Sequence, residues 1–287
     1  MQLPASQVTP NSDLVPLSAV QRLLKRLALG EPVTALGVRS ARGAEIARLA
    51  KASGYDLVWV DLEHSSMPID AAVQICACAH DLGMVSLARV PERDYGVIGR
   101  LLDGGVMGII APRIETAQHA ADVVAACRFP PAGHRSAIAQ LPTVGYRRMP
   151  AAQLNEACNQ NTLVKLLIES PTGIANLAQI AAVPGVDLIG IGANDLSAEL
   201  GVAGQFRHAL MQSALAAALD ACRCAGKPLA IGGISDAVQM AELIAQGAVP
   251  FVMAGIDTEM LLSAMHDRIA QARLAYQPKN AIHASKS

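Results

Sequence analysis

The chain has 287 residues, of which 52% are hydrophobic and 16% are charged. Its 23 Lys and Arg nearly balance its 24 Asp and Glu, and no basic run occurs, so we expect neither nucleic acid nor an anionic membrane as a partner. No segment approaches the roughly 18 uncharged apolar residues of a membrane span, and residues 1–16 lack the pattern of a signal peptide. These features predict a soluble, cytoplasmic protein.

Short apolar runs bounded by turn residues recur along the chain and predict strands buried on both faces. They cover residues 33–38, 57–61, 85–90, 107–111, 163–169, 188–191, 228–231 and 251–254. Longer amphipathic stretches separate them and predict helices. These cover residues 42–53, 69–82, 116–127, 174–182, 207–225, 235–246 and 258–275.

Eight strands with intervening helices predict an α/β fold, a (β/α)₈ TIM barrel. An open doubly wound sheet is the alternative, but no Gly-x-Gly-x-x-Gly follows the first strand. We expect a single domain over residues 17–276, with flexible tails at 1–16 and 277–287. The segment 129–161 is too long for an ordinary connection, and we interpret it as a lid or substrate wall on the catalytic face.

Six cysteines are present, and five of them lie in Ala-rich stretches expected to be helical. The two Cys-x-Cys pairs would place their thiols about 200° apart around a helix, which is wrong for one metal ion. We therefore expect small buried thiols in a reducing compartment.

In a barrel of this kind, chemistry is carried by the C-terminal ends of the strands. These ends supply Asp61, Glu63, His64, Arg89, Arg113, Glu115, Glu169, Asn194 and Asp195. Glu169 and Asp195 come from neighbouring strands without a cysteine nearby, which favours a hard cation such as Mg²⁺ or Mn²⁺. The set predicts an acidic site with at least one arginine.

Structural explanations exist for several of these residues. Asp195 can cap the next helix. Asp61 can be a buried acid paired with Arg89, and His64 can be a surface histidine of a loop. Glu169 is harder to explain in this way, because it closes an apolar strand and the following helix does not need it.

Five motifs, in this order and spacing, resemble the metal-dependent class II pyruvate aldolases of the HpcH/HpaI family. They are Asp-Leu-Glu-His at 61–64, Ala-Arg-Val-Pro at 88–91, Phe-Pro-Pro-Ala-Gly-His-Arg at 129–135, Ile-Glu-Ser at 168–170 and Gly-Ala-Asn-Asp-Leu-Ser at 192–197. The resemblance extends from about residue 33 to about residue 275. It implies a barrel of the phosphoenolpyruvate/pyruvate superfamily, assembled as a homo-oligomer, commonly a trimer of dimers with the last helix exchanged between subunits.

The resemblance also implies the metal site. Glu169 and Asp195 would hold a divalent ion, Mg²⁺ or Mn²⁺ with Co²⁺ as a further candidate, and no organic cofactor is implied. The ion would bind the keto and carboxylate oxygens of pyruvate, and the backbone N–H groups from Ala193 to Asp195 would hold the carboxylate. Asn194 adds a side-chain amide close to the metal.

The implied reaction cleaves a 4-hydroxy-2-oxo acid to pyruvate and an aldehyde, or runs in reverse, through an enolate of pyruvate. Arg89 would sit over the enolate oxygen, and His64, oriented by Asp61, would move the proton of the hydroxyl group. The other aldolase strategy is a Schiff base, which requires a lysine in the pocket. Lys165 is the only lysine in a predicted strand; it stands four residues before Glu169, so we expect it to lie deeper and disfavour it as a nucleophile.

Departures from the family pattern concern the second substrate. Leu167 replaces the usual glutamine, and Arg135 is followed by serine instead of glycine. We expect Arg135, Tyr146 and Arg147 to form part of a pocket for an acidic aldehyde, against the alternative of a solvated surface loop.

Two other functional classes remain open. A lyase or condensing enzyme acting on a coenzyme A thioester and a 2-oxo acid would use a similar site, although no basic cluster for nucleotide phosphates is evident. A catalytically silent barrel is disfavoured, because such a protein has no reason to retain the five residues Asp61, His64, Arg89, Glu169 and Asp195 together.

Overall fold

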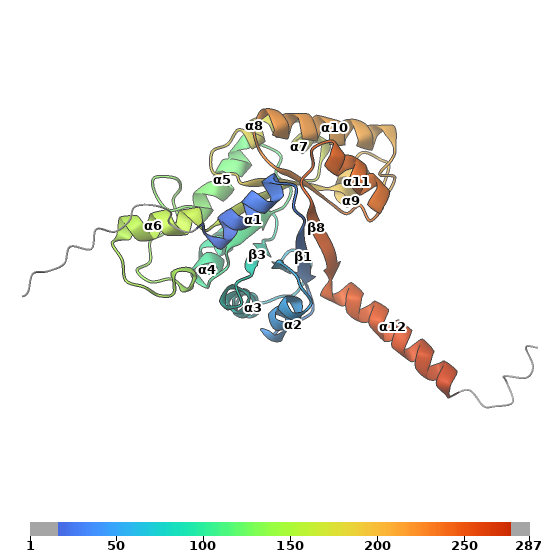
Figure 1. Cartoon of the computed structure of the whole chain (residues 1–287). Coiled ribbons are helices and arrows are strands. Elements are labelled where there is room, and N and C mark those ends of the chain that lie inside the picture. Colours follow the sequence, from blue (N-terminus) through green and yellow to red (C-terminus); the bar gives the residue numbers. More distant parts are fainter. Residues whose placement is uncertain (1–16, 277–287) are drawn as a thin grey trace, which may run out of the picture.

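The computed structural model describes residues 17–276, and eight parallel strands form its centre. They are β1 (Val33–Val38), β2 (Leu57–Asp61), β3 (Val85–Arg89), β4 (Gly108–Ala111), β5 (Leu163–Ile168), β6 (Leu188–Gly192), β7 (Leu229–Gly232) and β8 (Phe251–Ile256). The strand order is β7-β6-β5-β4-β3-β2-β1-β8, so the sheet curves into a nearly closed barrel (Figure 1). The expected (β/α)₈ TIM barrel is confirmed.

Helices alternate with the strands along the chain. The α-helices are α1 (Ala19–Ala28), α2 (Glu45–Ala52), α3 (Ile69–Asp81), α4 (Ile98–Asp103), α5 (Ala117–Cys127), α6 (Ala151–Gln160), α7 (Pro171–Ala175), α8 (Leu177–Ala181), α9 (Ala193–Glu199), α10 (Ala209–Cys224), α11 (Ala237–Ala245) and α12 (Asp257–Ala275). Two 3₁₀ turns are η1 (Tyr95–Val97) and η2 (Pro142–Val144). All six cysteines are free thiols, and four of them are buried.

Two apolar layers hold the barrel together. The larger layer lies between the strands and the surrounding helices, and the smaller one fills the barrel interior. Val20, Leu23 and Leu27 of α1 belong to the interior layer, so α1 closes the N-terminal end of the barrel. A capping box between Ser18 and Gln21 fixes the start of this helix, which the hydrophobic pattern had not indicated.

The segment 129–161 does not lie on the catalytic face. It follows α5 and leads into β5, so it belongs to the connections at the N-terminal end of the strands. Ser18, at the start of α1, donates a hydrogen bond of 3.3 Å to the carbonyl of Gln160, which ties the segment to that end. Phe129, Leu141 and Leu154 give it a small core of its own. The expectation of a lid or substrate wall is corrected.

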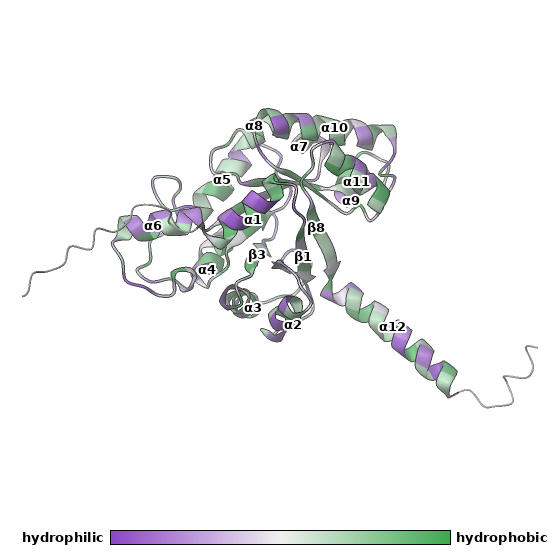
Figure 2. Ribbon diagram, in the orientation of Figure 1, coloured by the Kyte–Doolittle hydropathy of each residue, from purple (hydrophilic) through white to green (hydrophobic). Residues whose placement is uncertain are grey.

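The last helix, α12, leaves the barrel and extends away from it (Figure 1). Apolar residues alternate with polar ones along its length (Figure 2), and several of the apolar ones are exposed. These are Met260, Leu261, Leu262, Met265, Ile269 and Leu274. Within residues 17–276 no helix is long and apolar enough to cross a membrane. The tails expected at 1–16 and 277–287 lie outside the described residues.

Candidate active site

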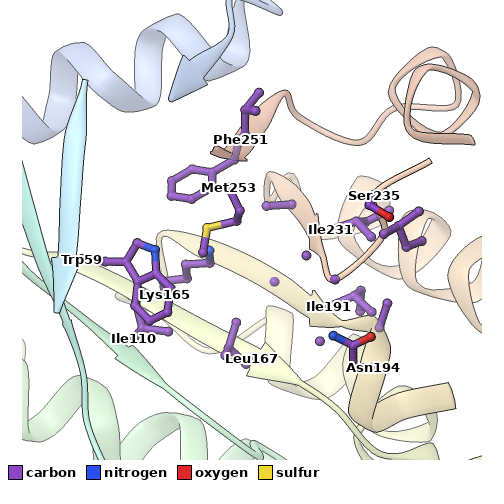
Figure 3. A pocket seen from close by; sticks show the side chains of 18 of the residues that line it. Trp59, Ile110, Lys165, Leu167, Ile191, Asn194, Ile231, Ser235, Phe251 and Met253 are labelled. Carbon is purple, nitrogen blue, oxygen red and sulfur yellow. The ribbon is translucent and has the colours of Figure 1, made fainter. Parts of the chain in front are cut away.

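A cavity of about 520 Å³ opens at the C-terminal ends of the strands and reaches into the barrel. Arg89, Glu169, Asn194 and Asp195 line it near the strand ends, whereas Lys165 lies deeper. Figure 3 shows side chains from several strands meeting around this space. Residues far apart in the sequence are thus brought to one site.

Asp61 ends β2 and is fully buried. Its Oδ1 accepts a hydrogen bond of 2.9 Å from Nε of Arg89, and its Oδ2 accepts one of 2.6 Å from Nη2 of the same side chain. Nε of Arg39, just beyond β1, donates to Oδ2 at 2.8 Å. Burial alone would raise the pKa of Asp61, but the hydrogen bonds and charges of the two arginines hold the pKa at about 2. Asp61 therefore stays ionised and fixes both guanidinium groups.

Arg89 is further held by Glu63 and Trp59. Its Nη1 lies 3.2 Å from Oε2 of Glu63, and its guanidinium lies over the Trp59 ring at 5.2 Å. A planar guanidinium with three such restraints has a defined direction, which a lysine at this position would lack.

Glu169 follows β5 and is 5% exposed. Its Oε2 accepts a hydrogen bond of 3.0 Å from the backbone N–H of Arg113, whose φ of 49° lies in the left-handed region. A Cβ on Gly192 would lie 2.5 Å from Oε1 of Glu169, so glycine at this position of β6 gives the carboxylate its room. The hydrogen bond from Arg113 and the close approach of Gly192 together fix the direction of the Glu169 side chain.

The electrostatics of this carboxylate favour a cation. Burial raises the pKa of Glu169, the hydrogen bond from Arg113 opposes this, and the negative charges of Glu63 and Asp195 raise it further. Asp195, in the first turn of α9, faces the same cavity. Two carboxylates that repel one another fit a divalent cation, which would relieve the repulsion.

Within residues 17–276 no group of three or more His, Cys, Asp or Glu is arranged as a metal centre. A cation at Glu169 and Asp195 would therefore have few protein ligands. Hard cations such as Mg²⁺ bind in this way, with water and substrate oxygens completing the shell.

The sequence profile of the family described as "HpcH/HpaI aldolase/citrate lyase" matches residues 39–264, which include all of these site residues. The chain belongs to this family. The family indicates a carbon–carbon lyase, and relatives with aldolase names support an aldolase.

Two relatives and one solved structure illustrate the similarity to the HpcH/HpaI family. A 4-hydroxy-4-methyl-2-oxoglutarate aldolase of Chaetomium globosum is 35% identical over 90% of this chain and 99% of its own length. A 4-hydroxy-2-oxovalerate aldolase of Rhodococcus jostii is 36% identical over 85% and 95%. An HpcH/HpaI aldolase of Desulfitobacterium hafniense has the same fold, with a TM-score of 0.80, 24% identity and coverage of 90% and 98%.

His64 departs from the arrangement expected for an HpcH/HpaI aldolase. Asp61 accepts a hydrogen bond from the backbone N–H of His64 at 3.2 Å, and it does not orient the imidazole. The imidazole Nε2 lies 3.7 Å from Oε2 of Glu63, and the side chain is 57% exposed. His64 is not among the residues that line the cavity.

The expected second-substrate residues also lie elsewhere. Arg135 is buried, where it donates a hydrogen bond of 2.7 Å to Asp103 and covers the ring of Phe129 at 4.4 Å. Tyr146 and Arg147 are exposed, and none of the three lines the cavity. Within one chain, the segment that carries them lies at the other end of the barrel from the cavity.

Three cavity residues were missed or set aside at the level of sequence. Arg39 directly follows β1, so the strand-end rule that found Arg89 applies to it as well. Trp59 and Lys165 lie inside strands, and only the closed barrel shows that their side chains reach the cavity. Both side chains point into it in Figure 3.

Proposed function

We propose that this enzyme cleaves a 4-hydroxy-2-oxo acid to pyruvate and a carbonyl compound, or joins the two in reverse. Two aldolase relatives carry substrate names of this class. The observation that supports the proposal most directly is the placement of Glu169, Asp195 and Arg89 on the wall of one cavity. Cleavage of this bond leaves negative charge on the keto oxygen, and these groups suit the binding and stabilisation of such a charge.

We assign Glu169 and Asp195 as ligands of a divalent cation, Mg²⁺ or Mn²⁺ with Co²⁺ as a further candidate. When bound, such an ion supplies a Lewis acid that polarises the keto group. The first backbone N–H groups of a helix have no partner inside that helix, so those from Ala193 to Asp195 are free to bind the substrate carboxylate. Asn194 adds an amide on the same wall.

Arg89 donates to the oxygen that gains charge, and Asp61 serves as the residue that positions it. His64 does not line the cavity, so it is our candidate for moving the proton of the substrate hydroxyl group through a bridging water. Its imidazole lies beside Glu63, so we assign its orientation to Glu63 instead of Asp61. Glu63 suits this role because burial raises its pKa and makes it a ready acceptor from an imidazole N–H.

The experiment that tests the proposal uses protein stripped of metal with a chelator. Mg²⁺, Mn²⁺ or Co²⁺ is then restored, and release of pyruvate from 4-hydroxy-2-oxovalerate is followed. We expect release only with metal, and none in Glu169→Ala. Metal-independent release, or metal-dependent release that Glu169→Ala leaves unchanged, would contradict the assignment.

The family description also covers citrate lyases, so thioester chemistry is the second candidate. A parallel assay with acetyl coenzyme A and oxaloacetate, following the free thiol, separates the two. Thiol release without any aldol cleavage would favour the second candidate.

We further propose that the protein acts in the cytoplasm as a homo-oligomer, a hexamer formed as a trimer of dimers. The exposed apolar residues of α12, including Leu262, Met265 and Ile269, support this proposal, because a helix that leaves its own barrel can bury them only against another chain. We accordingly propose that α12 is exchanged between subunits.

A further inference from the structure

The deep end of the cavity holds two hydrogen-bond donors that have no acceptor in the described part of the chain. Lys165 is 5% exposed, and Trp59 is 4% exposed. The indole Nε1 of Trp59 is buried without a partner. Within residues 17–276 the influences on the pKa of Lys165 are burial and the charges of Arg89 and Glu169, with no hydrogen bond among them. In Figure 3 both side chains point toward the same part of the cavity, beside Met253.

A buried ammonium without a counter-ion is unfavourable, and the structure compensates for it only in part. Nζ of Lys165 lies over the ring of Phe251 at 4.0 Å, a cation–π contact. Burial lowers the pKa of Lys165 to about 8, the charge of Arg89 adds to this effect, and Glu169 opposes it. A negatively charged group of a bound ligand, placed beside Nζ of Lys165, would supply the missing counter-charge.

The neighbouring strand makes room for the lysine. A Cβ on Gly190 would lie 3.0 Å from Cε of Lys165 and 2.7 Å from Cδ2 of Leu167, so glycine at this position of β6 admits the stem of the lysine. The other side chains around it include Ile110, Phe251 and Met253, which offer no charged or strong acceptor. An anionic group of a bound ligand would supply one.

We propose that Lys165 and Trp59 form a second anion-binding subsite, which holds the far carboxylate of a dicarboxylic 2-oxo acid substrate. This inference rests on the proposed function, because the 2-oxo acid end of the same molecule would lie at Glu169 and Asp195. Lys165 lies on β5 and Glu169 directly follows it, so the two are four residues apart, about 13 Å along the strand direction. The lysine stem covers part of this distance, so a chain of about five or six carbon atoms would bridge the two ends.

The test uses Trp59 as its own reporter, because it is the only tryptophan of the chain. Its fluorescence is titrated, with Mg²⁺ present, with 2-oxoglutarate and with 2-oxopentanoate, which has the same chain length but no far carboxylate. We expect 2-oxoglutarate to bind at least about tenfold more tightly, one good ionic contact. Lys165→Met should remove this difference, and Lys51→Met, at an exposed lysine of α2, should keep it.

A second variant tests the subsite independently, in case Lys165→Met does not fold. Trp59→Phe removes the indole donor and keeps an aromatic ring beneath Arg89, and calorimetry replaces fluorescence as the readout. We expect it to weaken 2-oxoglutarate several-fold more than it weakens 2-oxopentanoate.

Other outcomes separate the subsite from the proposed function. The protein could bind 2-oxoglutarate in a way that depends on Lys165, yet neither bind pyruvate nor exchange the methyl protons of pyruvate. This result would reject the proposed function and support the subsite. Normal pyruvate exchange with equal affinity for both probes in the wild-type protein would reject the subsite and leave the function standing. Covalent trapping of pyruvate on Lys165 by borohydride would also overturn the subsite, because the amine would then be a nucleophile.

Discussion

Asp61 accepts two hydrogen bonds from Arg89, one of 2.9 Å from Nε to Oδ1 and one of 2.6 Å from Nη2 to Oδ2. The two residues lie at the C-terminal ends of adjacent strands. The register of β2 and β3 pairs the two residues directly, so the barrel itself sets this contact. Asp61 thereby determines where the Arg89 guanidinium lies relative to Glu169 and Asp195.

Asp61→Asn should destabilise the protein strongly, because it leaves Arg39 and Arg89 without their shared counter-ion. Breaking a buried ion pair costs about 3–5 kcal/mol, measured as the free energy of unfolding in urea. The matched change Asp56→Asn, at the more exposed pair with Arg26, should cost about 1 kcal/mol or less. Equal losses in the two variants would contradict the role assigned to Asp61.

The same pair predicts a pH dependence. The pKa of Asp61 is about 2 in the folded protein, below its ordinary value of 3.8. The folded state therefore binds this proton less readily than the unfolded state, and the stabilisation is complete above about pH 4 and lost as the pH falls toward 2. Asp61→Asn should show a shallower loss of stability over this range than the wild-type protein, and parallel curves would count against the prediction.

Gly192→Ala should disable the metal site without disturbing the backbone. The φ of Gly192 is −87°, which alanine adopts freely, but its Cβ would lie 2.5 Å from Oε1 of Glu169. We expect the activating metal concentration to rise at least about tenfold, as for other changes to groups that support metal ligands. Gly99→Ala, with nothing within 4 Å of the new Cβ, is the control and should leave metal activation unchanged.

Glu169→Gln should raise the melting temperature of the chelator-treated protein at neutral pH. The pKa of Glu169 is raised on folding, so its ionised form is disfavoured, and the unfavourable effect grows as the pH rises past the ordinary value of 4.5. A gain of about 1 kcal/mol corresponds to about 2–4 °C. Added Mn²⁺ should stabilise the wild-type protein and not the variant, with Glu156→Gln on the surface of α6 as the control. Stabilisation of the variant by Mn²⁺ would argue against Glu169 as a ligand.

Charges at the exposed apolar residues of α12 should dissociate the oligomer. Leu262→Glu combined with Met265→Glu places two carboxylates where the proposed partner chain packs. Light scattering coupled to size exclusion should show a smaller species, while circular dichroism shows that helix content is kept. The control Glu259→Gln, on the same helix, should leave the assembly unchanged, and an unchanged mass in the double variant would reject the role of α12.

The sequence was sufficient for the barrel because parallel strands buried on both faces appear as apolar runs. The predictions for β1 and β2 match the structure residue for residue. The apolar pattern does not predict helix α1, although Ser18 and Gln21 form a recognisable capping box. The length of segment 129–161 predicts a lid, but the segment follows helix α5 and so lies at the N-terminal end of the strands.

The site was predicted in part. The strand-end rule located Asp61, Arg89, Glu169 and Asp195, which the barrel does bring together. Sequence spacing could not distinguish a contact with the His64 backbone from one with its imidazole. Nor could it show that Lys165 and Trp59 converge, because this depends on how two distant strands face each other across the barrel.

The central claim is that this site forms the enolate of pyruvate with the help of a divalent metal. The most direct measurement is exchange of the methyl protons of pyruvate for deuterium in D₂O, with metal-free protein and after addition of Mg²⁺, Mn²⁺ or Co²⁺. We predict exchange only when metal is present, and its loss in Glu169→Ala. Exchange at the same rate without metal, or its absence with every metal, would contradict the claim.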